Sequence, residues 1–132
     1  MSFYEQIKIS PIHGGRKWKV LEDIKYTILT LWKPLPITIP KGFIFDGASI
    51  PRLFWVIGTP MWTDTLPGAL IHDFIYRNQF LSRNEADQVF NEEMQKSKVR
   101  YIKRIVFYTG VRIWGWLAWK QRKKELVRNS LF

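Results

Sequence analysis

The character of the sequence changes at Asp46-Gly47, and this change constrains the fold more than any other feature. Before it, residues 16–23 and 25–32 are rich in the β-branched and aromatic side chains that strands prefer. Residues 35–45 predict two further short strands on either side of the turn sequence Pro40-Lys41-Gly42. The prolines of this stretch restrict these strands to sheet edges or strand ends. The first part of the chain therefore predicts a small antiparallel β-sheet.

After this point the sequence predicts a loop and then three helices. Residues 46–65 are interrupted by proline and glycine, which favours a loop. Pro67 suits the first turn of a helix, and Ser82 and Glu85 have the spacing of a capping box at the start of a second one. Apolar residues at helical spacing indicate a third helix. The expected helices span residues 66–80, 82–96 and 101–125 and precede a basic tail, 126–132.

The expected fold class is therefore α+β, with a small N-terminal antiparallel β-sheet followed by a three-helix core. A chain of 132 residues is long enough for one hydrophobic core, so we expect a single domain, 1–132. The chain contains no cysteine, which excludes disulfide bonds and thiolate metal sites.

The positive charge is concentrated in the last third of the chain. The net charge is +10, and the segment from Lys96 onward contains a single acid, Glu125, among its many lysines and arginines. A localised basic surface favours an anionic partner: phospholipid, nucleic acid or an acidic protein face.

The residues that suggest chemistry lie on the first two expected helices. His72 and Asp73 are adjacent, so their side chains diverge by about 100° on a helix. Tyr76 follows His72 and Arg77 follows Asp73, each at i+4. A short connection should fold the second helix back antiparallel, which brings Asp87 toward the face of His72 and Tyr76. A carboxylate beside an imidazole fixes its tautomer and stabilises its protonated form, as a general base requires. The alternative is a buried histidine satisfied by Asp87, a polar lock between two helices.

Asp73, on the other face, has two possible partners. It can meet the Asp46-Gly47 loop and form an oxygen site suited to calcium. It can instead form a plain salt bridge with Arg77 at i+4. Arg52, Arg77 and Arg83 are candidates for steering a phosphate head group, the alternative being ordinary surface arginines.

Two resemblances rest on these residues. The string His72-Asp-Phe-Ile-Tyr-Arg-Asn78 and the following helices resemble the core of the bacterial and fungal phospholipase A2 group over residues 66–115. The longer pattern, Phe45-Asp-Gly-Ala-Ser-Ile-Pro-Arg52 through the third helix, resembles a family of uncharacterised proteins common in tailed bacteriophages and prophages.

The phospholipase resemblance implies a role for each matching residue. His72 would be the general base that activates water for attack on an acyl ester, Asp87 would orient it, and Tyr76 would support that pair. Asp73 would bind calcium together with the Asp46-Gly47 loop, and the metal would stabilise the oxyanion. The chain departs from that group in lacking its disulfides and in the sequence of its metal loop.

Three functions follow as hypotheses. The first is calcium-dependent hydrolysis of phospholipid acyl esters by a bacteriophage protein. The alternative is a non-enzymatic virion or tail component that retains the phospholipase-like helices as a scaffold. A third, a divalent-metal phosphohydrolase, ranks low because it requires further histidines and His13 is the only other one.

The third helix suggests how the protein could meet a membrane. Its apolar run, 105–119, contains Arg112 and is shorter than the roughly 20 residues of a membrane span. Trp114, Trp116 and Trp119 followed by basic residues are typical of an anchor at a phospholipid surface, with a core helix as the alternative. Other virion proteins are further candidate partners, and nucleic acid ranks lower. The first residues lack the pattern of a signal peptide, so we expect synthesis in the host cytoplasm and a place in the virion as an option.

Overall fold

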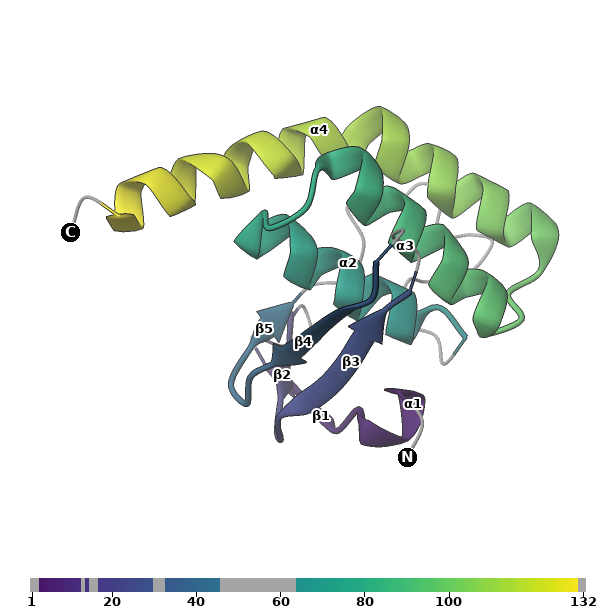
Figure 1. Ribbon diagram of the computed structural model, residues 1–132, viewed down its shortest axis with the longest axis horizontal. Helices are drawn as coiled ribbons and strands as arrows, with labels where there is room; N and C mark the ends of the chain where they lie inside the picture. The colour runs from purple at the N-terminus through teal and green to yellow at the C-terminus, as the bar shows by residue number, and fades with distance from the viewer. Residues whose placement is uncertain (1–2, 13, 15–16, 30–32, 46–63, 131–132) are drawn as a thin grey trace. The chain divides into compact units, whose positions relative to one another are not determined.

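The computed structural model describes residues 3–12, 14, 17–29, 33–45 and 64–130. The chain divides into two compact units, Met1–Gly47 and Ala48–Phe132, which are described separately. The division coincides with the change of sequence pattern at Asp46-Gly47. The first unit contains two small antiparallel sheets and the second contains three long helices, so the expected α+β class is confirmed (Figure 1).

In its described residues, the N-terminal unit contains one short helix and five strands. These are α1 Phe3–Gln6, β1 Ile9–Ile12, β2 Lys17–Val20, β3 Ile24–Ile28, β4 Leu35–Ile39 and β5 Ile44–Phe45. One sheet has the order β1-β2-β5, and the other pairs β3 with β4, all antiparallel. Pro36 lies in the two-stranded sheet and Pro11 in the outer strand β1, the edge positions that proline tolerates.

Two features of this unit differ from the expectation. The sequence did not predict α1 or β1, because each is only four residues long and carries little periodic signal. The segments on either side of Pro40-Lys41-Gly42 separate into different sheets, since β4 pairs with β3 and β5 pairs with β2. Gly42 has φ +92°, and the turn is closed by a hydrogen bond from Phe43 N to Pro40 O at 3.1 Å.

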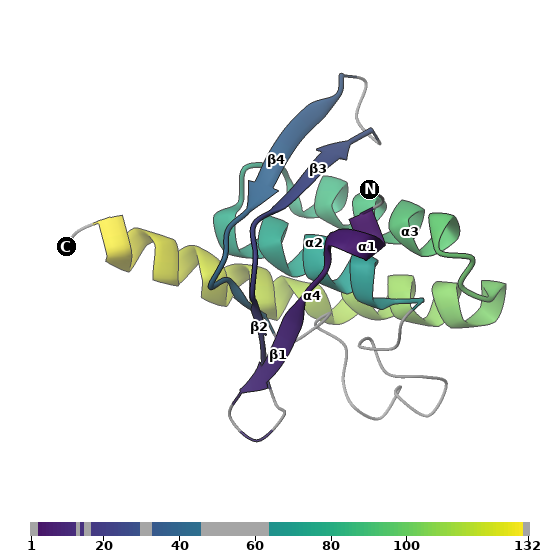
Figure 2. The ribbon, with the colours of Figure 1, turned by 90° about the horizontal axis from the view of Figure 1, so that it is seen from below.

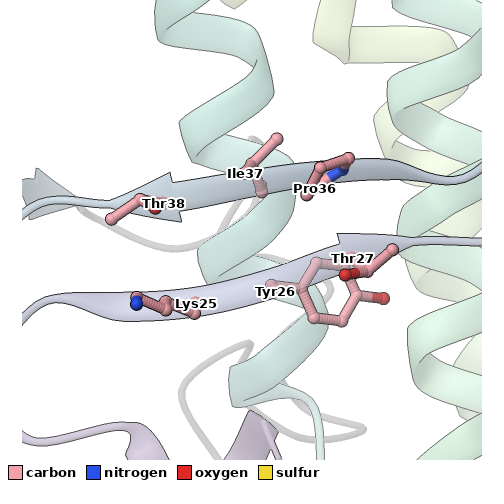
Figure 3. Close-up of a pocket in the computed structure, with 6 residues that line it drawn as sticks. All are labelled: Lys25, Tyr26, Thr27, Pro36, Ile37 and Thr38. Atoms are coloured by element: carbon pink, nitrogen blue, oxygen red, sulfur yellow. The ribbon is translucent and has the colours of Figure 1, made fainter.

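The strand pair β3–β4 is supported from one side by α1. The Gln6 side chain accepts a hydrogen bond from Lys25 N at 2.9 Å and donates one to Lys25 O at 3.1 Å, which satisfies backbone groups of β3. The ring of Phe3 packs against Tyr26 at 4.4 Å between centroids. A pocket of about 360 Å³ lies along the pair and is lined by Lys25, Tyr26, Thr27, Pro36, Ile37 and Thr38 (Figure 3). It contains none of the site residues predicted from the sequence.

The helical unit consists of α2 Leu66–Asn78, α3 Arg83–Lys96 and α4 Tyr101–Ser130, and each helix contacts the other two (Figures 1 and 2). Their buried side chains include the cluster Phe90, Met94, Val99, Phe107 and Val111. Near the start of α4, buried Lys103 pairs with Asp64 at 2.9 Å and so links α4 to the residues before α2.

Local signals set most of the helix ends. The capping box predicted at Ser82 is present, with Ser82 Oγ accepting from Glu85 N and the Glu85 side chain accepting from Ser82 N. Lys98 adopts φ +58°, and Val99 N donates to Met94 O, which ends α3 in a Schellman-type turn.

Two helix ends differ from the expectation. Helix α2 stops at Asn78, two residues early, because Gln79 takes a left-handed conformation (φ +50°). Helix α4 continues to Ser130, so residues 126–130 of the expected basic tail are helical. No glycine or proline interrupts these residues. Arg128 in the last turn interacts favourably with the negative end of the helix dipole.

Candidate functional site: a buried histidine–aspartate–arginine network

His72 on α2 and Asp87 on α3 meet in the interior of the helical unit. His72 Nε2 lies 2.7 Å from Asp87 Oδ1, and the two side chains are 1% and 0% exposed. Because an ionised carboxylate can only accept hydrogen bonds, His72 donates from Nε2, which places the lone pair of a neutral imidazole on Nδ1. The structure thus contains the approach of Asp87 to His72 that the short connection between the helices predicted.

Tyr76 shares the same carboxylate oxygen. Its hydroxyl donates to Asp87 Oδ1 at 2.7 Å, and its ring lies 4.1 Å from the ring of His72. Burial, followed by the negative charge of Asp87, raises the pKa of the Tyr76 hydroxyl far above its ordinary value. The phenol therefore remains a protonated donor throughout the physiological pH range.

Two arginines complete the environment of Asp87. Arg112 Nη1 on α4 donates to Asp87 Oδ2 at 2.7 Å. Arg83 Nη1 lies 3.6 Å from the same oxygen and donates to the carbonyl oxygens of Val111 and Arg112, each at 3.2 Å. Both carboxylate oxygens thus have partners, and adjacent guanidinium groups balance the buried charge.

Sequence reasoning did not assign Arg112 to the site. A signal was present, because Arg112 is the only charged residue in the apolar run 105–119. A charge at that position of a packed helix implies a buried partner of opposite sign.

Glycines allow the helices to approach one another closely around this network. A Cβ atom on Gly68 would lie 2.9 Å from the ring of Phe90, which itself packs against His72 at 5.0 Å between centroids. A Cβ atom on Gly115 of α4 would lie 2.6 Å from the hydroxyl oxygen of Tyr76. The position of the Tyr76 hydroxyl therefore depends on the absence of a side chain at residue 115.

This close approach leads to a stability prediction for Gly115→Ala. In a helix interior, alanine is more favourable than glycine by about 1 kcal/mol. Overpacking against the fixed Tyr76 hydroxyl, however, costs about 1–3 kcal/mol. We expect a net loss in the free energy of unfolding, measured by urea titration. In a Tyr76→Phe background the clashing oxygen is gone, so Gly115→Ala should become neutral or stabilising. An equal loss in both backgrounds would contradict the proposed contact.

Asp73 forms the i+4 salt bridge with Arg77 rather than sharing the network of His72. Asp73 Oδ2 lies 3.2 Å from Arg77 Nε, and the Asp73 side chain is 5% exposed. Calcium takes about six to eight oxygen ligands. In the described part of the chain, no group of three or more histidine or acidic side chains is placed to hold a metal ion. The other residues proposed for the metal or the head group, Asp46, Gly47 and Arg52, lie outside the described residues, as does His13.

The three tryptophans of α4 are placed differently from one another. Trp119 packs edge-on against Tyr76 at 5.1 Å between ring centroids, and its carbonyl accepts a hydrogen bond from Gln79 Nε2 at 2.8 Å. Trp114 is half-buried, whereas Trp116 is 50% exposed. None of the helices in the described residues is both long and apolar enough to cross a membrane.

Comparisons with known proteins place this chain in a family. A family model described as "Protein of unknown function (DUF1353)" matches residues 18–111, which include His72, Tyr76 and Asp87. The Uncharacterized protein y4jT of Sinorhizobium fredii (strain NBRC 101917 / NGR234) is 31% identical over 78 residues, which cover 58% of this chain and 23% of that protein. The matched segment therefore spans less than a quarter of the length of that relative. No solved structure matches the chain. Because the family model spans more than half of the chain, the protein belongs to the DUF1353 family.

Proposed function

We propose that the protein hydrolyses phospholipid acyl esters, with His72 as the general base. The observation that carries the proposal is the 2.7 Å contact between His72 Nε2 and Asp87 Oδ1. It holds the proton on Nε2 and leaves Nδ1 to take a proton from water as the water attacks the ester carbonyl. The imidazolium formed in that step would be stabilised by the Asp87 carboxylate.

Tyr76 and Arg112 would act as positioning residues. Each donates to one oxygen of Asp87 at 2.7 Å, so the carboxylate cannot rotate away from the imidazole. The 1% exposure of His72 also has a consequence for substrate binding. Neighbouring side chains must move before an ester and a water molecule can reach Nδ1.

Calcium is the cofactor that we propose, with Asp73 and groups from the Asp46-Gly47 loop as ligands. Arg77 would have to release or share Asp73, because its guanidinium lies 3.2 Å from one carboxylate oxygen. The described residues do not by themselves form such a site. Bound calcium would polarise the ester carbonyl and stabilise the developing oxyanion.

The similarity of residues 45–52 and 72–77 to proteins of tailed bacteriophages supports a setting for this activity. We propose that the protein is made during phage infection and acts on lipid of the host envelope. Phospholipid is the substrate class that both the phospholipase-like residues and the basic last third of the chain favour.

A second candidate, a non-enzymatic virion or tail component, is favoured by a different observation. His72 and Asp87 are almost fully buried, and both oxygens of Asp87 are occupied, one of them by Arg112. A network that is satisfied in this way also holds three helices in one arrangement without any reaction.

An assay of fatty-acid release separates the two candidates. The purified protein is incubated with vesicles of phosphatidylglycerol and phosphatidylethanolamine, with calcium or with a chelator, and fatty acids and lysophospholipids are measured by mass spectrometry. We expect release with calcium and little with chelator. The Asp73→Asn variant should lose both release and calcium binding measured by calorimetry. Release that persists in chelator would contradict the calcium site but not the proposed hydrolysis. No release with calcium or with chelator would favour the structural role.

A further inference from the structure

We propose that the outward-facing side of α4 binds the surface of an anionic lipid bilayer. This outer face consists of Ile113, Trp116, Leu117, Lys120, Lys124 and Val127, which recur at intervals of three and four residues and so share one side of the helix. The opposite side carries Val111, Gly115 and Trp119, which pack in the core or near Tyr76. The helix thus has one side inside the protein and an apolar and basic side turned outward.

The first half of the outer face is apolar and exposed. Ile113, Trp116 and Leu117 are 51%, 50% and 53% exposed, although burial in an apolar phase is where such side chains gain free energy. Ile102 and Ile105 extend the same side toward the start of the helix and are also exposed. Apolar residues gathered in this way mark an interaction site more often than scattered ones do.

The second half of the outer face is cationic. Lys120 and Lys124, with Lys123 beside them, are exposed, and Glu125, the only acid of α4, is paired with Arg122 at 3.3 Å. In Figures 1 and 2 this part of α4 extends beyond the ends of α2 and α3, so the other two helices of the unit do not cover it. Lysines next to an apolar surface bring their ammonium groups to anionic head groups while their alkyl stems lie along the acyl chains.

The combination of the two halves favours lipid over the other anionic partners. A nucleic acid would satisfy the lysines but leave Ile113, Trp116 and Leu117 in water. The centre of a protein interface is typically depleted in lysine. An amphipathic helix that lies in the plane of a bilayer places its lysines at the anionic head groups and its apolar side chains in the lipid, with tryptophan at head-group depth. Of the three tryptophans in the anchor expected from the sequence, Trp116 belongs to the outer face, whereas Trp119 packs against Tyr76.

Vesicle flotation of the full-length protein tests this docking surface. We expect wild type to float with phosphatidylglycerol-containing vesicles, to float less as salt is raised, and to remain unbound with phosphatidylcholine vesicles. Trp116→Gln and the pair Lys120→Glu with Lys124→Glu should each reduce the bound fraction at least several-fold. Leu29→Gln and Lys41→Glu are matched controls, because Leu29 and Lys41 are also exposed but lie in the other unit. Equal binding by the outer-face variants and these controls would overturn the proposal.

The absence of cysteine allows a direct measurement of which face is in contact. A polarity-sensitive fluorophore is attached to Leu117→Cys on the outer face, or to Asn129→Cys on another side of the same helix. A blue shift with anionic vesicles at residue 117 and none at residue 129 is expected. A shift at both positions, or a shift with duplex DNA in place of vesicles, would contradict lipid docking by this face.

Docking does not depend on the proposed hydrolysis, and one variant keeps the two apart. His72→Gln should bind vesicles as wild type does, because His72 is buried on α2 and takes no part in the outer face. Loss of hydrolysis with retained flotation would leave the docking proposal intact. Hydrolysis without any flotation of wild type would overturn docking and leave the enzyme proposal standing.

Discussion

Replacing His72 with glutamine should reduce fatty-acid release by about 10²–10⁴-fold, the usual contribution of a general base, while the protein stays folded. Glutamine can still donate a hydrogen bond to Asp87, but it has no nitrogen that accepts a proton from water at neutral pH. It loses the ring contacts of His72 with Tyr76 and Phe90, which should lower the free energy of unfolding by about 1–2 kcal/mol. Activity is measured on vesicles and stability by urea titration.

Two variants serve as controls for this result. Ile75→Val removes one methylene from a buried residue on α2 and should cost about 0.5–1.5 kcal/mol without touching the imidazole, so its activity should match wild type. Tyr76→Phe removes one donor to Asp87 but keeps the base, so its activity should lie between wild type and His72→Gln. Full activity of His72→Gln would exclude the general-base role. If His72→Gln is the only one of these variants that unfolds, the role of His72 is structural.

Removing the Asp87 carboxylate should have the largest effect on stability. In Asp87→Ala, the buried donors of His72 and Tyr76 and the half-buried guanidinium of Arg112 lose their shared acceptor. Breaking a buried ion pair from one side costs about 3–5 kcal/mol, and most small domains have only about 5–15 kcal/mol in total. We therefore expect the free energy of unfolding to fall by about 3–5 kcal/mol. This loss should be seen as a lower midpoint of urea unfolding and a lower melting temperature.

The exposed pair of Lys8 and Glu22 provides a contrast with the buried network. Their side chains are 57% and 61% exposed, so Glu22→Ala should cost less than about 1 kcal/mol. The double variant Asp87→Ala with Arg112→Met should recover part of the loss, because the Arg112 guanidinium is then not left without its partner. A loss for Asp87→Ala as small as that for Glu22→Ala would show that the network contributes little to the fold.

Local sequence signals were sufficient for several elements and for half of the site. Ser82 and Glu85 marked the start of α3 because a capping box is an interaction within four residues. His72 and Tyr76 were placed on one face by helix periodicity, and the short connection before Ser82 brought Asp87 toward them. The left-handed Gln79 that ends α2 had no such signal, because this conformation is typical of glycine or asparagine.

The remaining features were decided by contacts between residues far apart in the chain. Strands β4 and β5 are close in sequence but join different sheets, and each choice depends on its partner strand rather than on its own residues. Arg112 reaches Asp87 across 25 positions. That contact requires a particular rotation of α4, which packing of Gly115 against the Tyr76 hydroxyl permits.

The sequence by itself determined that a strand-rich part precedes three helices, that His72 and Tyr76 share a face, and that positive charge is concentrated after Lys96, because these depend on periodicity and composition. Only the tertiary structure decided that Asp87 is neutralised by Arg112, that Trp119 packs inward and that Trp116 and Leu117 are exposed beside lysines. The physical reason is that a helix's periodicity shows which residues share a face. The direction of that face is set by packing against other helices.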